Sequence, residues 1–281
     1  MTIRNSILLF LLLFLFACSK NDLTTDPNPT TKDTCRLLSA DLFDGQNKIH
    51  GSATFTYNND GYITASTSTQ DSAFTTYSAT YTNNKIVLKT KYYGDYVYIL
   101  DDQRRAISFE ENNLPYSHVL ETYTYNSDGY LDRLTRTESY GITTYQLSYT
   151  NGNLVSAKGS TVPEPNSSYR DYVDVTFAYS EDKAVELLEP LNPLKALYVT
   201  KPLAGFFGKP SKNLLIKTSS FSYINPSYKF GSENTFSFEK DANNKITRIN
   251  VRQLLTDNTI DATPYVRLDR SDYYLIRYSC N

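Results

Sequence analysis

The chain has 281 residues, and its 28 Lys and Arg side chains nearly balance its 30 Asp and Glu side chains, leaving a formal net charge of -2. Nucleic-acid binding demands a clustered basic surface, so this balance argues against a nucleic-acid partner. The sequence contains 25 Tyr and 14 Phe residues and no Trp. Aromatic residues favour strands, and the composition therefore predicts an all-β fold.

The first residues have the pattern of an export signal. Arg4 provides a positive charge, residues 7–16 form an apolar run, and Ala17 precedes Cys18. This pattern is a lipobox, where a signal peptide is removed and the new N-terminal cysteine is acylated. We predict a lipoprotein signal peptide at 1–17 and lipidation of Cys18. The alternative, a transmembrane anchor, needs about twice as many apolar residues.

Residues 18–34 follow the predicted cleavage site. They contain two prolines and a single large apolar side chain, so they cannot bury enough surface to fold. We predict a disordered tether, which would reach roughly 50 Å when extended. The lipid makes the membrane a predicted partner. The expected location is the outer membrane, with the folded domain on the cell surface or the periplasmic face.

Residues 53–63 and 121–131 are two copies of one hairpin pattern, in which an aromatic strand ends in Asn-x-Asp-Gly. This turn favours a left-handed glycine, at Gly61 and Gly129, followed by a β-bulge. The Asn151-Gly152 pair fits a type I′ turn. Related hairpins follow, with a pre-turn aromatic residue at Tyr81, Tyr149, Tyr179 and Phe238.

Successive hairpins predict a single β domain over 35–281, built as a long antiparallel meander. A twisted sheet with this many strands curls or closes, so we expect an open or barrel-like sheet. One segment breaks the pattern, because residues 186–213 carry four prolines among leucines and phenylalanines. We predict a Pro-rich apolar insertion here, with a helical turn near Leu194 to Leu197, lying over the sheet core or across a barrel mouth.

Cys35 and Cys280 lie near the two ends of the predicted domain. A cysteine pair in an exported protein suggests a disulfide, and we predict one between these two residues. The alternative is two separately buried thiols.

The sequence offers no catalytic motif. The two histidines, His50 and His118, lack the spacing of a zinc site, so neither a metal nor a cofactor is predicted. A glycosidase would use a pair of carboxylates, for which the acid pairs at 101–102 and 110–111 are candidates. Adjacent strand residues point to opposite faces, and the first pair suits a turn, so we assign no catalytic residue.

Four tyrosines around Gly94 form a candidate ligand-binding face, since aromatic rings stack on sugars or peptides. The alternative explanation is cross-strand aromatic packing. The candidate residues are Tyr92, Tyr93, Tyr96 and Tyr98.

The lipobox, the hairpins, residues 203–214 and the closing Tyr278-Ser279-Cys280 together resemble a family of Bacteroidota lipoproteins. That family is known as a domain of unknown function with a porin-like fold. The hairpins alone also show a weak similarity to the Tyr-Asp repeats of large secreted shell proteins. The resemblance implies an architecture over 35–281 and supplies no functional residues.

These observations predict an outer-membrane-anchored lipoprotein that binds a ligand or partner, or serves as a structural element of the envelope. A glycan, a peptide or an envelope protein would be its partner. The first alternative is a glycan-acting hydrolase with a dispersed site in the concavity of the sheet. The second is a transmembrane pore, which the Thr- and Ser-rich strands disfavour.

Overall fold

The computed structural model of the chain describes residues 36–69, 76–91, 94–113, 117–163, 172–184, 192–197, 205–225, 228–259 and 265–279. The strands belong to one compact unit, Arg36–Ser279. The other unit, Met1–Cys35 with Cys280–Asn281, lies outside the described residues. The tether, the lipidation of Cys18 and the disulfide between Cys35 and Cys280 therefore stay predictions.

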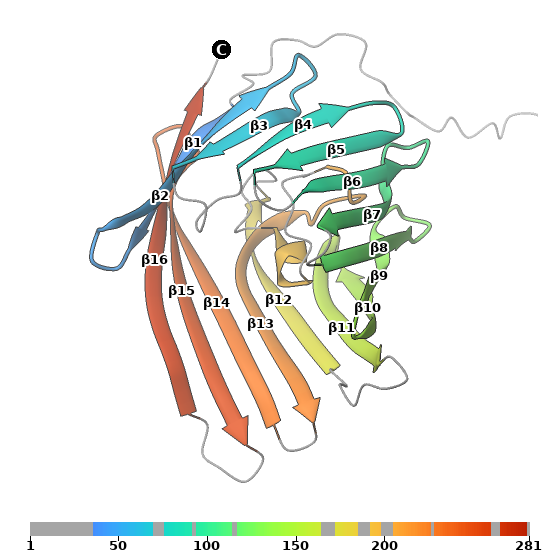
Figure 1. Ribbon diagram of the computed structural model, residues 1–281. Helices are drawn as coiled ribbons and strands as arrows, with labels where there is room; N and C mark the ends of the chain where they lie inside the picture. The colour runs from blue at the N-terminus through green and yellow to red at the C-terminus, as the bar shows by residue number, and fades with distance from the viewer. Residues whose placement is uncertain are drawn as a thin grey trace, which may run out of the picture. The chain divides into compact units, whose positions relative to one another are not determined.

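Sixteen antiparallel strands form a closed barrel (Figure 1). Each strand pairs with its neighbours in the sequence, and β1 pairs with β16 to close the sheet. This confirms the predicted all-β meander and resolves its shape as a closed barrel. The strands are β1 (Arg36–Asp44), β2 (Ile49–Tyr57), β3 (Ile63–Ser68), β4 (Tyr77–Tyr81), β5 (Lys85–Thr90), β6 (Asp95–Leu100), β7 (Ala106–Asn113), β8 (Ser117–Tyr125), β9 (Leu131–Glu138), β10 (Gly141–Thr150), β11 (Asn153–Pro163), β12 (Tyr172–Lys183), β13 (Asn213–Asn225), β14 (Tyr228–Lys240), β15 (Ile246–Thr259) and β16 (Tyr265–Ser279).

The turn chemistry matches the prediction from the sequence. Gly61 and Gly129 adopt positive φ values of 86° and 85°, and the register shifts at the end of β2 and of β8 mark the expected bulges. Asn151 and Gly152 both have positive φ, as a type I′ turn requires. The local sequence therefore fixes where these strands reverse.

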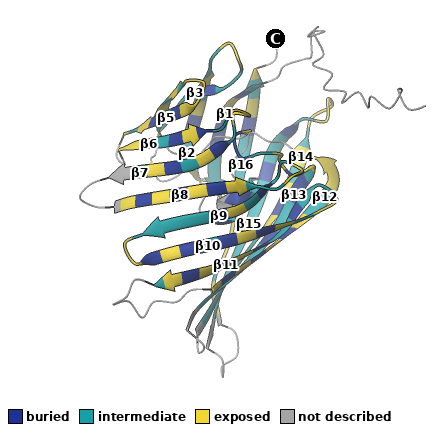
Figure 2. Cartoon of the chain, turned by 90° about the vertical axis from the view of Figure 1, so that its right-hand side faces the viewer, coloured by how far each residue is buried: buried dark blue, intermediate teal, exposed yellow. Residues whose placement is uncertain are grey.

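Residues alternate between the inside and the outside of the barrel. On β10, Tyr145 and Leu147 are buried whereas Gln146 and Ser148 are exposed. Figure 2 shows the same alternation of buried and exposed positions along β8 and β10. Because strand side chains point to opposite faces in turn, the barrel has an apolar interior and a largely polar outer surface.

The described part of the 186–213 insertion packs into the apolar interior. A 3₁₀ helix, η2 (Pro193–Leu197), forms where a helical turn is predicted. Leu197 is fully buried, and Phe206 and Phe207 join the same core cluster. Burial of these side chains explains why the insertion is apolar despite its prolines. Within the described residues, no helix has the length and apolar character needed to span a bilayer.

Candidate functional site

A strap, which we define as residues 205–212, crosses the hairpin turns at one end of the barrel. Its backbone hydrogen bonds to three separate hairpins, so the strap holds together elements far apart in the sequence. The bonds are Ala106 N to Phe206 O at 2.7 Å, Lys209 N to Gly129 O at 2.9 Å and Lys212 N to Gly152 O at 2.9 Å.

Gly208 lies where the strap approaches the β8–β9 hairpin most closely. A Cβ atom at this position would lie 2.5 Å from the carbonyl oxygen of Gly129 and 2.9 Å from the ring of Tyr125. Its φ of +76° also belongs to the left-handed region, which glycine adopts without strain. A side chain at 208 would therefore push the strap away from the barrel.

The pre-turn tyrosines of the hairpins have a shared role. Four of them point inward and donate a hydrogen bond to the carbonyl oxygen of a residue near the start of the preceding strand. The pairs are Tyr57 with Leu37 at 2.8 Å, Tyr81 with Ile63 at 2.7 Å, Tyr125 with Ala106 at 2.6 Å and Tyr179 with Leu154 at 2.8 Å.

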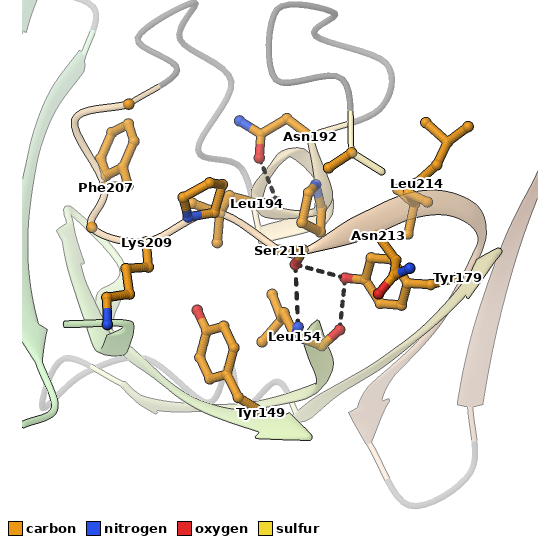
Figure 3. Close-up of a pocket in the computed structure, with 16 residues that line it drawn as sticks. Tyr149, Leu154, Tyr179, Asn192, Leu194, Phe207, Lys209, Ser211, Asn213 and Leu214 are labelled. Atoms are coloured by element: carbon orange, nitrogen blue, oxygen red, sulfur yellow. Dashed lines mark hydrogen bonds between the residues drawn. The ribbon is translucent and has the colours of Figure 1, made fainter. Parts of the chain in front are cut away.

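Tyr149 occupies the same pre-turn position and breaks this pattern. Its ring packs against Tyr130 with the centroids 4.6 Å apart. Its hydroxyl forms no hydrogen bond with any residue that the structure describes, and Figure 3 shows it pointing towards the strap. Burial raises the pKa of this hydroxyl above its ordinary value, so Tyr149 presents a neutral donor at neutral pH.

The Tyr149 side chain lines a half-open cavity of about 80 Å³ beneath the strap (Figure 3). Four large apolar side chains form much of its wall, and the polar groups come from both the barrel and the strap. These four are Leu154, Leu194, Phe207 and Leu214, Leu215 also lines the cavity, and the polar residues include Asn192, Lys209, Ser211 and Asn213. A mostly apolar pocket with a few converging polar groups is the usual form of a small-molecule site.

Several polar groups of the cavity are already engaged. Ser211 Oγ accepts a hydrogen bond of 3.2 Å from Leu154 N and lies 3.1 Å from Tyr179 Oη. Tyr179 donates its single hydroxyl hydrogen to Leu154 O, so Ser211 donates its own to Tyr179. Asn192 Oδ1 accepts from Leu194 N at 3.0 Å, which holds the start of η2.

Lys209 and Tyr149 retain free donors. The Lys209 ammonium lies 5.6 Å from the centre of the Tyr130 ring and forms no ion pair with a described residue. The backbone amides of Lys209 and Lys212 donate to hairpin carbonyls, so they are not arranged as a phosphate cradle. The cavity therefore offers the Tyr149 hydroxyl beside an apolar wall, with the exposed Lys209 side chain at its rim.

Two of the four tyrosines predicted to bind a ligand lie on β6, and they are part of the barrel core. Tyr96 and Tyr98 are buried, with exposed fractions of 7% and 1%, and Tyr98 packs on Phe109 and Phe207. They contribute to the barrel core, and the structure does not bring them into the cavity beneath the strap. Tyr92 and Tyr93 lie outside the described residues, as do Cys18, Cys35 and Cys280.

The histidines are far from the cavity and pair with carboxylates. His50 Nε2 lies 3.0 Å from Asp44 Oδ2, and His118 Nε2 lies 3.2 Å from Glu110 Oε1. Asp101 Oδ1 accepts from two backbone amides of its own turn, as predicted. In the parts of the chain that the structure describes, no three His, Cys, Asp or Glu side chains gather as a metal site.

Acidic side chains do occur on the inner wall, which bears on the hydrolase alternative. Arg136 bridges two of them, with Nη1 2.8 Å from Glu121 Oε1 and Nη2 2.9 Å from Glu138 Oε1. Tyr123 and Tyr140 donate further hydrogen bonds to the two carboxylates. One guanidinium between two carboxylates leaves a net charge of -1, and the tyrosine hydroxyls add neutral donors, so a substrate would have to disrupt this network to reach either carboxylate.

No pattern in the sequence groups Tyr149, Lys209 and Ser211. The sequence signals for this cavity are the pre-turn position of Tyr149 and the Gly-Lys-Pro-Ser segment of the strap. Neither signal reveals that the two segments meet, because 60 residues separate Lys209 from Tyr149 and closure of the barrel brings them together.

No protein-family model matches the chain, and no curated protein matches its sequence. A solved structure does match: the porin-like protein from Bacteroides uniformis ATCC 8492, determined at 2.32 Å resolution. The TM-score is 0.52 at 14% sequence identity, and the match covers 86% of this chain and 96% of the other. At this level of identity the likeness concerns the fold, and it supports a porin-like barrel for this chain.

Proposed function

We propose that this protein is an outer-membrane lipoprotein whose sealed barrel binds a small ligand beneath the strap. The observation that carries the proposal is the Tyr149 hydroxyl. Four equivalent tyrosines use their hydroxyls to fasten neighbouring strands, whereas Tyr149 directs its hydroxyl to a cavity. A hydroxyl at a cavity that has no acceptor among the described residues is available to a ligand that brings one.

A cavity-filling substitution tests this proposal. Ala184 lines the cavity, and Ala184→Leu should occupy the space of the ligand. Ala178→Leu is the matched control, because Ala178 lies exposed on β12, the strand that ends just before Ala184. Native mass spectrometry of the purified protein should detect a small bound molecule in the wild type and the control, and lose it in Ala184→Leu. Its persistence in Ala184→Leu, or its absence from the wild type, contradicts the proposal.

The likeness to a porin-like protein favours a second candidate, a transmembrane pore. A membrane-spanning barrel presents an apolar band to lipid and a polar lumen. Here the outer face of the long strands carries ion pairs, Lys217 with Glu233 at 2.8 Å and Arg252 with Asp269 at 2.7 Å. The strap residues Phe206 and Phe207 pack into the apolar core of the barrel. These features support a sealed barrel, and recordings across planar bilayers, where steady conductance steps would support the pore, decide between the two.

The lipid anchor is a separate part of the proposal. Cys18→Ala should leave the protein soluble in the periplasm or as an uncleaved precursor, because the acylated thiol is removed. Continued acylation of this variant would contradict the lipobox.

Protease treatment of intact cells, compared with a periplasmic control protein, locates the domain. Digestion places it on the surface, where an extracellular glycan or peptide is its partner. Protection until lysis indicates an envelope protein or ligand inside the periplasm.

A further inference from the structure

We propose that the ligand beneath the strap is a short-chain carboxylate, with its carbon chain against the apolar wall and its carboxylate between Lys209 and Tyr149. This inference rests on the proposed function and names the ligand class of the same site.

The size of the cavity sets the length of the ligand. An apolar cavity of about 150 Å³ accommodates benzene, which has six carbon atoms. A cavity of about 80 Å³ scales to three or four carbon atoms. Only one end of a longer lipid would fit, whereas a short chain fits whole.

The free polar groups are donors. The Tyr149 hydroxyl has no acceptor among the described residues, and an ammonium such as Lys209 only donates. Ser211 is occupied by Leu154 and Tyr179. A ligand that brings acceptors satisfies both donors, and a carboxylate does so with charge-assisted hydrogen bonds. An alcohol or an amide brings fewer acceptor sites and no charge.

The charge of the strap favours an anion. Its two lysines, Lys209 and Lys212, form no ion pair within the described part of the chain, and residues 205–212 contain no acid. Asp182 is paired with Lys240 at 3.0 Å, and Asp128 belongs to the β8–β9 turn. Asp132 of β9 accepts a hydrogen bond from Gln146, and its negative charge helps to raise the pKa of Tyr149. A carboxylate at the mouth of the cavity therefore meets two lysines without an ion-pair partner among the described residues, opposed by the charge of Asp132.

Propionate is the probe for this inference, with 1-propanol and propionamide as uncharged ligands of similar size. Saturation-transfer NMR with the purified protein should detect propionate binding, and should detect the uncharged pair at least tenfold more weakly. Lys209→Gln and Tyr149→Phe should each weaken propionate binding about tenfold, because a hydrogen bond to a charged group is lost. Lys209→Arg should restore most of it.

Two controls separate the ligand contacts from the fold. Lys158→Gln removes an exposed charge on the outer face of β11, and Ala178→Leu enlarges an exposed residue of β12. Both variants should bind propionate as the wild type does, whereas Ala184→Leu should not bind it.

Each result decides a different claim. Equal binding of propanol and propionate overturns the carboxylate inference and leaves a ligand-binding cavity in place. Binding that survives Ala184→Leu moves propionate to another site and overturns the inference as well. If none of the three small ligands binds but native mass spectrometry finds a ligand lost in Ala184→Leu, only the ligand class is wrong. If native mass spectrometry finds no ligand in the wild type, the proposed function fails together with the carboxylate inference.

Discussion

The Tyr125 hydroxyl lies 2.6 Å from the carbonyl oxygen of Ala106, and the amide of Ala106 in turn donates to Phe206 O of the strap. One tyrosine thus links two strands and the strap through a single residue. The same arrangement without the strap recurs at Tyr57 and Tyr81. The hairpin repeat therefore fastens the end of the barrel at regular intervals.

Tyr125→Phe should destabilise the barrel, and Tyr149→Phe should not. Loss of the Tyr125 hydroxyl leaves the Ala106 carbonyl without this donor, which costs about 1 kcal/mol or more. Removal of the Tyr149 hydroxyl breaks no hydrogen bond with the described residues. Urea unfolding of the two variants beside the wild type measures the difference. Equal losses would mean that Tyr149 is fastened like its counterparts and would remove the basis of the ligand proposal.

Gly208→Ala should destabilise the strap more than Gly205→Ala does. Both glycines have positive φ, so both substitutions carry the same kind of backbone strain. An added Cβ at 208 meets the Gly129 carbonyl at 2.5 Å, whereas one at 205 meets nothing within 4 Å. The difference between their unfolding free energies isolates the close approach of strap and hairpin. Similar values for the two variants would show that this contact does not hold the strap.

The sequence predicts the hairpins well because their information is local. Asn58 and Gly61 specify a turn through their own backbone preferences, and the prediction needs no distant partner. The apolar side chains of the insertion likewise predict burial, which Phe206 and Phe207 confirm.

The cavity lies beyond such local reasoning. The cavity forms only where the strap contacts particular β-hairpins. Which hairpins it contacts is decided by the closure of the whole sheet, in which β1 pairs with β16. Alternation of apolar and polar residues marks Tyr98 as half-buried but does not distinguish an inner core from a concave binding face. Ring packing on Phe109 and Phe207 settles that question in the structure.

Arg136→Met should be strongly destabilising, because it removes the positive charge that pairs with a buried carboxylate. Glu121 is 3% exposed, and its Oε1 lies 2.8 Å from Arg136 Nη1. Breaking a buried ion pair on one side typically costs about 3–5 kcal/mol. The double variant Glu121→Gln with Arg136→Met removes both charges and should recover part of the loss. Thermal unfolding measures the stability of both variants. No recovery of stability in the double variant would mean that the charge of Glu121 does not cause the loss in Arg136→Met.

The barrel should lose stability between about pH 10 and pH 12. Burial raises the pKa of Tyr57, Tyr81 and Tyr179 to about 12, whereas an unfolded tyrosine titrates near 10. Below pH 10 both states keep the proton and the stabilisation is complete. As the pH rises towards 12 the unfolded chain loses protons first, so the free energy of unfolding falls. Tyrosinate absorbance should therefore rise together with loss of the β circular dichroism signal. Ionisation of all tyrosines near pH 10 with the fold intact would contradict this.

A disulfide between Cys35 and Cys280 is expected to join the two ends of the barrel. Arg36 and Ser279 are register partners on β1 and β16, and the cysteines are their immediate neighbours in sequence. Directly opposed strand residues have Cα atoms about 4.5–5.5 Å apart, which is within the range a disulfide spans. Closing a loop of 245 residues (280 minus 35) would restrict the unfolded chain by up to about 5 kcal/mol. Peptide mapping without reductant should yield a linked pair, and reduction should lower the urea midpoint of the wild type but not of Cys35→Ser. Two free thiols would leave the β1–β16 hydrogen bonds to close the sheet unaided.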